Sequence, residues 1–277
     1  MRGAHLRGVT AKNTMKPNEL TPVYIEAFDL DDAWFQCLSK ILDHGHVYKI
    51  TRGSYQDQRR LEFDFVTVRI KNPSHQIIPI IPEGSSIPAP TSMEYLHGYL
   101  SYLLTGQKTE TEDYTYGERL VDAKARVKEV RDGKELVKEM PLEVNQVEEV
   151  IKMYKTQGHG TNQAVMEIGM PSDIKLHDPP CLRLIDTRIR YGKLHFFPYF
   201  RSWDLWGGFP SNLGGLELVK QYMAEEIGVE DGEIIAVSKG LHLYDYSWEL
   251  AKIRTNKPNP LALRGIGYGQ ERMKKDA

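Results

Sequence analysis

Four stretches of the chain carry apolar residues at the spacing of an amphipathic helix. In residues 25–43 apolar side chains repeat every three or four positions, and the acidic pair Asp31-Asp32 suits the first turn of such a helix. The same periodicity predicts helices over residues 91–105, 145–155 and 213–227, and it makes Gly106 the expected C-cap of the first of these.

Alternation of apolar and polar residues predicts the strands. Residues 182–189 and 194–201 alternate and would pair as an antiparallel hairpin. In residues 59–73 the alternation slips by one position, as in a strand with a bulge. Residues 233–238 and 241–246 predict two further strands, while residues 124–139 predict either a hairpin or a solvated turn between helices. Because no regular βαβ order appears, we expect an α+β fold in which helices flank a mixed β-sheet.

The predicted hairpin brings a thiol next to a guanidinium. A three-residue loop, residues 190–192, would put Gly192 where a left-handed backbone is needed, and Cys181 would then lie opposite Arg201. A two-residue loop would instead place Ser202 opposite the cysteine. We favour the first register, in which paired Cβ atoms lie about 4.5 to 5.5 Å apart. An arginine so close would stabilise the thiolate and lower the pKa of Cys181 below its usual value of about 8.5.

Composition limits the classes of partner. The chain has 277 residues, of which 40% are hydrophobic and 27% charged, as is ordinary for a globular protein. A formal net charge of −2 gives no general attraction to a polynucleotide, although a single nucleotide is compatible with it. The two cysteines, Cys37 and Cys181, offer neither a disulfide framework nor the spacing of a metal site, so we expect no metal. Cys37 falls within the first predicted helix, and we expect it in the core.

The ends of the chain carry no targeting signal that we recognise. No apolar run approaches the roughly 20 residues that a membrane helix needs, and the N-terminus lacks the apolar stretch of a signal peptide. We therefore expect a cytoplasmic protein with no membrane partner. Residues 1–18 are basic and polar without periodicity and predict a disordered leader, and residues 19–277 predict a single domain.

Short motifs follow one another in a fixed order between residues 110 and 250. They are Pro180-Cys181, Arg201-Ser202, Asp204, Gly207-Gly208, Pro210-Ser211-Asn212 and Leu241-His242-Leu243-Tyr244. In order and spacing this series resembles the thymidylate synthase family. The earlier Tyr-Thr-Tyr-Gly-Glu-Arg run at residues 114–119 resembles the divergent, archaeal-type branch of that family.

The resemblance implies a fold, a reaction and a set of partners. It implies a thymidylate-synthase-like domain that packs sheet against sheet as a homodimer and acts as a methyltransferase, converting dUMP to dTMP. The cosubstrate would be 5,10-methylenetetrahydrofolate or a related tetrahydropterin. The thiolate of Cys181 would add to ring carbon 6 of the uracil, so that ring carbon 5 can attack the one-carbon unit. Asp204 would accept hydrogen bonds from the amino-pyrimidinone edge of the pterin, and Glu94 is the nearest acid to the segment that holds the family's general acid.

The remaining motif residues would bind the nucleotide. The phosphate would contact Arg201, Ser202 and Arg52, because guanidinium and hydroxyl groups donate to its oxygens, and Tyr116 would also contact the substrate.

Three further residues would read the base and the sugar. The amide of Asn212 can pair with the carbonyl at position 4 and the N–H at position 3 of uracil, with a helix N-cap ahead of Leu213 as the alternative role. His242 and Tyr244 would share one strand face and bind a sugar hydroxyl together.

The chain also departs from the family pattern. Thr161-Asn162-Gln163 stands where the family has an arginine pair that reaches the phosphate site of the partner subunit. Two other functions therefore stay open. One is a pyrimidine nucleotide hydroxymethylase acting on dUMP, dCMP or CMP, in which water completes the transfer instead of hydride. The other is a non-catalytic nucleotide-binding protein that keeps the fold.

Overall fold

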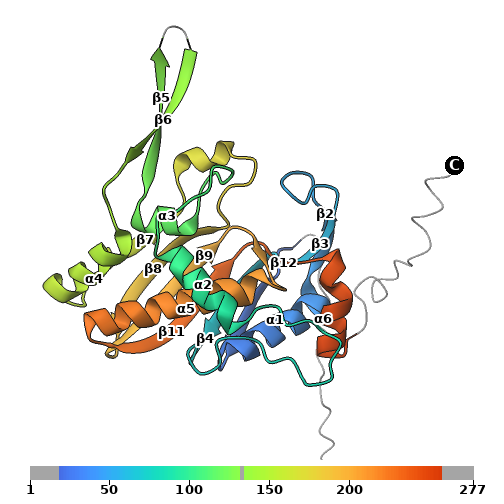
Figure 1. Ribbon diagram of the computed structural model, residues 1–277. Coiled ribbons are helices and arrows are strands. Elements are labelled where there is room, and N and C mark those ends of the chain that lie inside the picture. The colour runs from blue at the N-terminus through green and yellow to red at the C-terminus, as the bar shows by residue number, and fades with distance from the viewer. Residues whose placement is uncertain (1–18, 132–133, 258–277) are drawn as a thin grey trace, which may run out of the picture.

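The computed structural model describes residues 19–131 and 134–257, and Figure 1 shows them as a mixture of helices and strands. This arrangement confirms the α+β fold class. The predicted leader, residues 1–18, lies outside the described residues, and so do residues 132–133 within the predicted hairpin or turn of residues 124–139. Among the described residues, no helix has both the length and the apolar character needed to cross a bilayer.

The largest element is a six-stranded mixed sheet. Its spatial order is β1 (Pro22–Ala27), β4 (Phe65–Ile70), β11 (Glu230–Ser238), β9 (Lys193–Phe200), β8 (Leu182–Arg190) and β7 (Val165–Glu167). The pairs β1·β4 and β11·β9 run parallel, and the other three pairs run antiparallel. The sheet therefore mixes both strand directions, as predicted.

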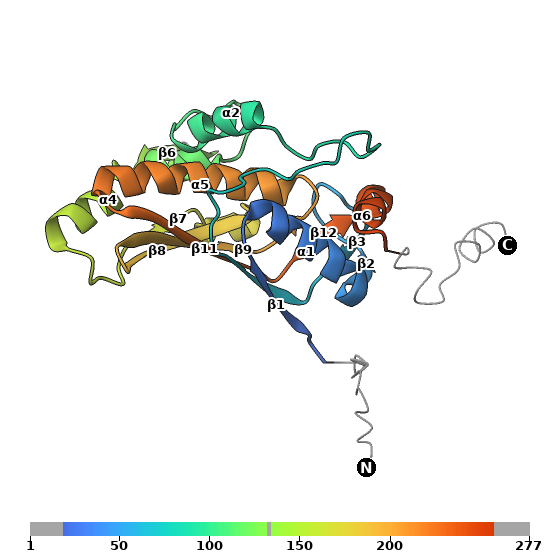
Figure 2. The same cartoon turned by 90° about the horizontal axis from the view of Figure 1, so that it is seen from below.

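The helices gather on one face of this sheet, as Figure 2 shows. They are α1 (Leu30–His44), α2 (Met93–Leu103), α3 (Tyr116–Val121), α4 (Gln146–Gln157), α5 (Gly208–Ile227) and α6 (Trp248–Thr255). The long helix α5 packs on β9 and β11, and α2 packs on α5. Burial alternates along β4, β9 and β11, so that one set of side chains enters the core beneath α5 and the other set is half-buried on the opposite face.

A second sheet carries much of the site. Its order is β10 (Trp203–Asp204), β12 (Leu241–Tyr244), β3 (Arg59–Glu62) and β2 (His46–Lys49). A separate hairpin, β5 (Lys124–Arg131) with β6 (Lys134–Pro141), extends away from the body of the molecule in Figure 1. Of the two readings of residues 124–139, the hairpin is correct.

Several predicted boundaries were wrong. The helix expected from residue 25 begins at Leu30, where the side chain of Asp29 caps it, and the preceding segment is the strand β1. Residues 59–73 form two strands, and the slip in alternation marks the passage from one sheet to the other rather than a bulge. The helix predicted from Leu213 begins five residues earlier, at Gly208, and the strand predicted to reach residue 246 ends at Tyr244. The C-cap of α2 is Leu104, not Gly106.

The central hairpin differs from the prediction in its turn and in the register of most of its pairs, and it keeps only the predicted pairing of Cys181 with Arg201. Its loop has two residues, Tyr191 and Gly192, both with positive φ (55° and 73°), and Arg190 pairs with Lys193. That register alone would set Cys181 opposite Ser202. A bulge between Leu182 and Leu184 shifts the pairing by one residue, and Leu182 then pairs with Phe200. The amide of Arg201 consequently donates to the carbonyl of Cys181 (2.8 Å), so these two residues are paired after all.

Candidate active site

One cavity of about 280 Å³ opens where the ends of several strands meet the start of α5. Nine of the ten predicted site residues line it: Arg52, Tyr116, Cys181, Arg201, Ser202, Asp204, Asn212, His242 and Tyr244. They come from segments far apart in the sequence, so only the tertiary fold brings them together. The volume is close to the lower end of the range found for small-molecule sites, about 300–1,000 Å³.

Cys181 stands beside Arg201, as predicted, but the guanidinium faces the backbone ahead of the cysteine. Arg201 Nε donates to the carbonyl oxygen of Pro180 (3.0 Å), and Nη2 donates to the carbonyl of Pro179 and pairs with Asp178 (3.3 Å). Burial raises the pKa of the Cys181 thiol above its ordinary value, and the positive charge of Arg201 offsets only part of this rise. The expected lowering of this pKa was therefore wrong, because loss of hydration outweighs the nearby cation.

The amide of Asn212 is held in one orientation. Trp203 Nε1 can only donate, and it donates to Asn212 Oδ1 (3.1 Å), while Asn212 Nδ2 donates to the hydroxyl of Tyr99 (2.9 Å). One N–H and one lone pair of the amide remain for a ligand. The N-cap of α5 is Gly207, so the alternative role of Asn212 as a helix cap was wrong.

His242 presents an acceptor to the cavity. Its Nδ1 lies 2.8 Å from the carbonyl oxygen of Gly240, which can only accept, so Nδ1 carries the proton. Nε2 is buried without a protein partner. Burial, together with the charges of Arg60 and Arg201, lowers the pKa of His242 to about 3, so the ring is neutral at physiological pH. The ring contacts Tyr244 edge to face, with centroids 4.6 Å apart, so the two side chains share one face as predicted.

Asp204 caps the start of α5. Its carboxylate accepts from the backbone N–H groups of Trp206 (3.2 Å), Gly207 (3.0 Å) and Gly208 (3.0 Å). A carboxylate has about four acceptor positions, so this geometry leaves Asp204 able to accept one more hydrogen bond. These hydrogen bonds give Asp204 a capping role in the turn before α5, and its pterin-binding role stays a prediction.

Comparison with known proteins accords with this geometry. A sequence model of thymidylate synthase matches residues 103–265. The chain belongs to the thymidylate synthase family. It is 33% identical over 230 residues to a Methanosarcina mazei protein and 34% identical over 228 residues to a Methanosarcina acetivorans protein, both named "Putative thymidylate synthase". Each match covers 82% of this chain and 92% of the relative. A Listeria monocytogenes thymidylate synthase is 32% identical over 110 residues, which is 39% of this chain and 35% of that protein.

In this thymidylate synthase family member, Glu94 lies outside the Cys181 cavity. It is exposed on the first turn of α2 and lines a neighbouring hollow together with Tyr95, Tyr99, Tyr102, Glu112 and Tyr116. Tyr116 lines both spaces, whereas Glu94 lines only the neighbouring hollow. Glu94 is thus the one predicted site residue that the fold does not bring to the thiol.

The structure also adds a cation that sequence reasoning missed. Arg60 lies on β3 directly opposite Tyr244 of β12, and it lines the cavity. Its neighbour Arg59 points elsewhere, toward Asp245 and the ring of Trp248. Nothing in the sequence distinguishes the two arginines except strand alternation, which puts Arg60 and Glu62 on the same face.

Helix α3 fastens the cysteine strand of this family member from the side. The hydroxyl of Tyr116 accepts from the backbone N–H of Leu182 (3.2 Å). Arg119 pairs with the buried Asp173 (2.9 Å), which also pairs with Arg183 in the bulge (3.2 Å). Buried ion pairs of this kind cost several kcal/mol when one partner is removed, so they hold α3, residues 171–175 and the bulge in fixed relation.

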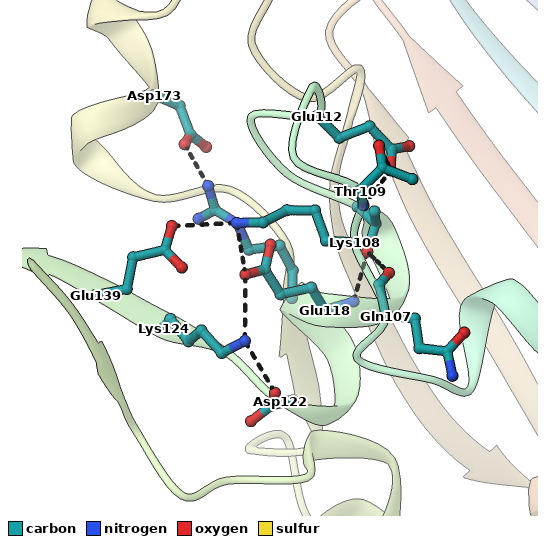
Figure 3. A network of polar contacts seen from close by, with 11 residues as sticks. Gln107, Lys108, Thr109, Glu112, Glu118, Asp122, Lys124, Glu139 and Asp173 are labelled. Carbon is teal, nitrogen blue, oxygen red and sulfur yellow. Dashed lines mark hydrogen bonds and ion pairs between the residues drawn. The ribbon is translucent and has the colours of Figure 1, made fainter.

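The base of the β5–β6 hairpin joins the same helix. Figure 3 shows Lys108 between Glu118 of α3 and Glu139 of β6, at 3.1 Å from each. Lys124 at the start of β5 pairs with Asp122 (3.2 Å) beside them. The projecting hairpin is therefore anchored through charges to the helix that supports Cys181.

Proposed function

We propose that this protein methylates dUMP to dTMP and that Cys181 is the nucleophile. The observation that carries the proposal is that a thiol, a uracil-complementary amide and a neutral histidine with a free acceptor line one cavity of about 280 Å³. A single pyrimidine nucleotide is the ligand whose groups match all three. Membership of the thymidylate synthase family supports the same reaction class.

Each nucleotide group has a matching partner on the protein. The amide of Asn212 retains one donor and one acceptor, which would pair with the carbonyl at position 4 and the N–H at position 3 of uracil. The free Nε2 of His242 would accept from the sugar hydroxyl, with Tyr244 beside it. The phosphate would lie near Arg52, Arg201 and Ser202, which line the same cavity.

The chemistry begins at the thiol. After losing its proton, the sulfur of Cys181 would form a bond to ring carbon 6, and the electron pair displaced to ring carbon 5 would attack the methylene carbon of the cosubstrate. The attack would break one of the two carbon–nitrogen bonds of the methylene bridge, and loss of the proton from ring carbon 5 would break the other and leave an exocyclic methylene on the base. Hydride from the tetrahydropterin would convert this methylene to the methyl group and expel the sulfur as a thiolate, which releases dTMP and the dihydropterin. Because Glu94 lies in the neighbouring hollow, we leave it out as a proton donor.

A second space can receive the tetrahydropterin. A hollow of about 530 Å³ shares Asp204, Gly208 and Asn212 with the Cys181 cavity and continues to Tyr95. The remaining acceptor position of Asp204 would face the amino-pyrimidinone edge of a pterin there. These features support 5,10-methylenetetrahydrofolate or a related tetrahydropterin as the cosubstrate.

We also propose a cytoplasmic homodimer in which each copy contributes one domain. The half-buried, helix-free face of the six-stranded sheet supports the dimer, because its central strands carry apolar side chains that a second copy could cover.

The test follows tritium and product mass. Protein incubated with dUMP tritiated at ring carbon 5 and methylenetetrahydrofolate should release tritium and form dTMP. Cys181→Ala should abolish release because it removes the proposed nucleophile, while Cys37→Ala, which removes the buried thiol, should retain it. Release that persists in Cys181→Ala would refute the nucleophile, and a hydroxymethylated product would favour the hydroxymethylase alternative.

A further inference from the structure

A strongly basic hollow, different from the proposed pterin hollow, adjoins the Cys181 cavity. It has a volume of about 370 Å³, and four cationic side chains line it: Arg52, Arg60, Arg201 and Lys239. One carboxylate, that of Glu62, lies among its lining residues. The three arginines and Ser202 line the cavity as well, and so does Ile50, so the two spaces meet at these five residues. An anionic group of a ligand at this junction would face the cations, while the remainder of that ligand lies in the Cys181 cavity.

Of these four cations, Arg60 has the side chain that is best positioned to bind an anion. Its Nε donates to the hydroxyl of Tyr48, its Nη2 lies 3.0 Å from Glu62 Oε2, and its guanidinium lies over the Tyr48 ring, 4.7 Å from the centroid. Its side chain is 21% exposed. A guanidinium has five N–H donors, so three remain after these contacts. These contacts with Tyr48 and Glu62 restrain the guanidinium, and Arg60 lines both spaces, so less entropy is lost when it binds an anion there.

The other cations are less well placed. Arg201 is engaged by two backbone carbonyls and by Asp178, and Arg52 is exposed and bonds only the carbonyl of Leu176 (3.3 Å) among the described residues. Lys239 is exposed between β11 and β12, at the rim of the basic hollow. The positive charge of Arg60 acts on the site: it offsets part of the rise in the pKa of Cys181 and contributes to the lowered pKa of His242.

We propose that Arg60 is the principal phosphate ligand of this protein, assisted by Lys239, and that the phosphate site is completed within one subunit. The proposal rests on the proposed function in taking a nucleoside monophosphate as the ligand, and its statement about one subunit rests on the proposed dimer as well. It accounts for phosphate binding without the family's arginine pair, in whose place Thr161-Asn162-Gln163 stands. Asn162 in that segment carries no charge and accepts a hydrogen bond from Arg188 (2.7 Å).

The first test compares a nucleotide with its nucleoside. Calorimetry should show that Arg60→Gln weakens dUMP binding about 10- to 100-fold, because a charge-assisted hydrogen bond is lost, while deoxyuridine binds as to the wild type. Arg60→Lys should fall between the two, since it keeps the charge but loses the fork. Arg59→Gln, on the opposite face of the same strand, should bind dUMP like the wild type. Equal dUMP affinity in Arg60→Gln and wild type would overturn the proposal.

Two further variants guard against misfolding. Lys239→Gln changes an exposed side chain and should weaken dUMP binding about threefold, with deoxyuridine unaffected. The double variant Arg60→Gln, Glu62→Gln removes the ion pair as a unit and should show the same selective loss as Arg60→Gln. Equal weakening of dUMP and deoxyuridine in the folded double variant would mean a general structural role and would contradict the proposal. A wild type that binds neither compound would instead refute the proposed function.

Subunit mixing tests whether the site lies within one chain. Subunits carrying Cys181→Ala, which are expected to be inactive, are mixed with subunits carrying Arg60→Gln under conditions that allow subunit exchange. The mixture is assayed for tritium release at a dUMP concentration where Arg60→Gln is impaired. If Arg60 serves its own chain, each site in a mixed dimer still lacks one group, and activity should not exceed that of Arg60→Gln alone. Recovered activity would show that Arg60 acts on the partner's site and would overturn completion within one subunit.

Discussion

At the scale of single residues, the sulfur of Cys181 is governed by two opposing effects. The sequence indicates the arginine next to it, and pairing with Arg201 is confirmed. The sequence does not indicate how far the thiol is removed from water, because that depends on elements as distant as β3, α3 and β12. Burial raises the pKa of Cys181 more than Arg201 lowers it, so in the free protein the thiol stays protonated at neutral pH.

The titration of Cys181 is open to direct measurement. The rate of alkylation by iodoacetamide, followed by mass spectrometry of the Cys181 peptide, should rise with pH and inflect above about 8.5, the usual pKa of a cysteine. Arg201→Gln should move the inflection upward because it removes the cation, and Asp178→Asn should move it downward because it removes a nearby anion. Cys37 is 0% exposed and its peptide serves as the unreactive reference. An inflection below the usual value in the wild type would contradict the dominance of burial.

Other residues show the same limit of sequence reasoning. Motif order located nine of the residues that line the cavity, since each had a distinctive chemical type at a recognisable spacing. Glu94 was chosen by proximity to a segment that did not align cleanly, and the fold places it in the neighbouring hollow. Arg60 was missed because its contact with Tyr48 depends on the pairing of β2 with β3, and because no motif marks it as a cavity residue.

At the scale of elements, the hairpin pairs Cys181 with Arg201 as predicted, although its turn and the register of its other pairs differ from the prediction. The pattern of residues 182–201 fixed the strands and their direction, but it could not separate a three-residue loop from a two-residue loop plus a bulge. Both routes pair Cys181 with Arg201. The bulge is held by contacts from other elements: the carbonyl of Arg183 accepts from Ile168 and Gly169, and its side chain pairs with Asp173. Long-range contacts, not local sequence, therefore set the register at the cysteine.

The two-residue turn carries a prediction about stability. Tyr191 adopts a left-handed backbone (φ 55°) and is 92% exposed, so its side chain contributes little packing in return for the strain. Asn tolerates this conformation, and Asn-Gly is the preferred pair for such a turn. Tyr191→Asn should therefore raise the free energy of unfolding by about 0.5 to 1 kcal/mol, as measured by urea denaturation.

A matched change should act in the opposite direction. Gly192 also has positive φ, so Gly192→Ala should lower the free energy of unfolding by about 1 kcal/mol. Neither change should alter the affinity for dUMP, because the turn lies at the far end of the strands from Cys181. A Tyr191→Asn protein no more stable than the wild type would mean that Tyr191 makes favourable contacts outside this subunit.

At the scale of the whole molecule, the sheet has two unlike faces. The helices cover one, while the other carries half-buried side chains, among them Phe197, Tyr199, Ile235 and Val237 on the central strands. Arg69 and Glu233 lie on this face too, paired at 2.6 Å. The alternation in the sequence predicted that these strands have two faces, but it could not tell which face the helices would cover.

A single charged substitution tests whether a second copy of the protein covers this face of the sheet. Val237 pairs with Thr67 and Tyr199 in the middle of the sheet, so Val237→Asp would place two carboxylates in a symmetric interface, one from each copy. Burying unpaired charges costs several kcal/mol each, so sedimentation velocity should show a dimeric wild type and a monomeric variant. Ile174→Asp makes the same chemical change at a side chain 80% exposed in the segment before Cys181, away from the sheet, and should leave the dimer intact. If Val237→Asp remains dimeric at the wild-type association constant, the copies meet through another surface, and the apolar central strands need a different explanation.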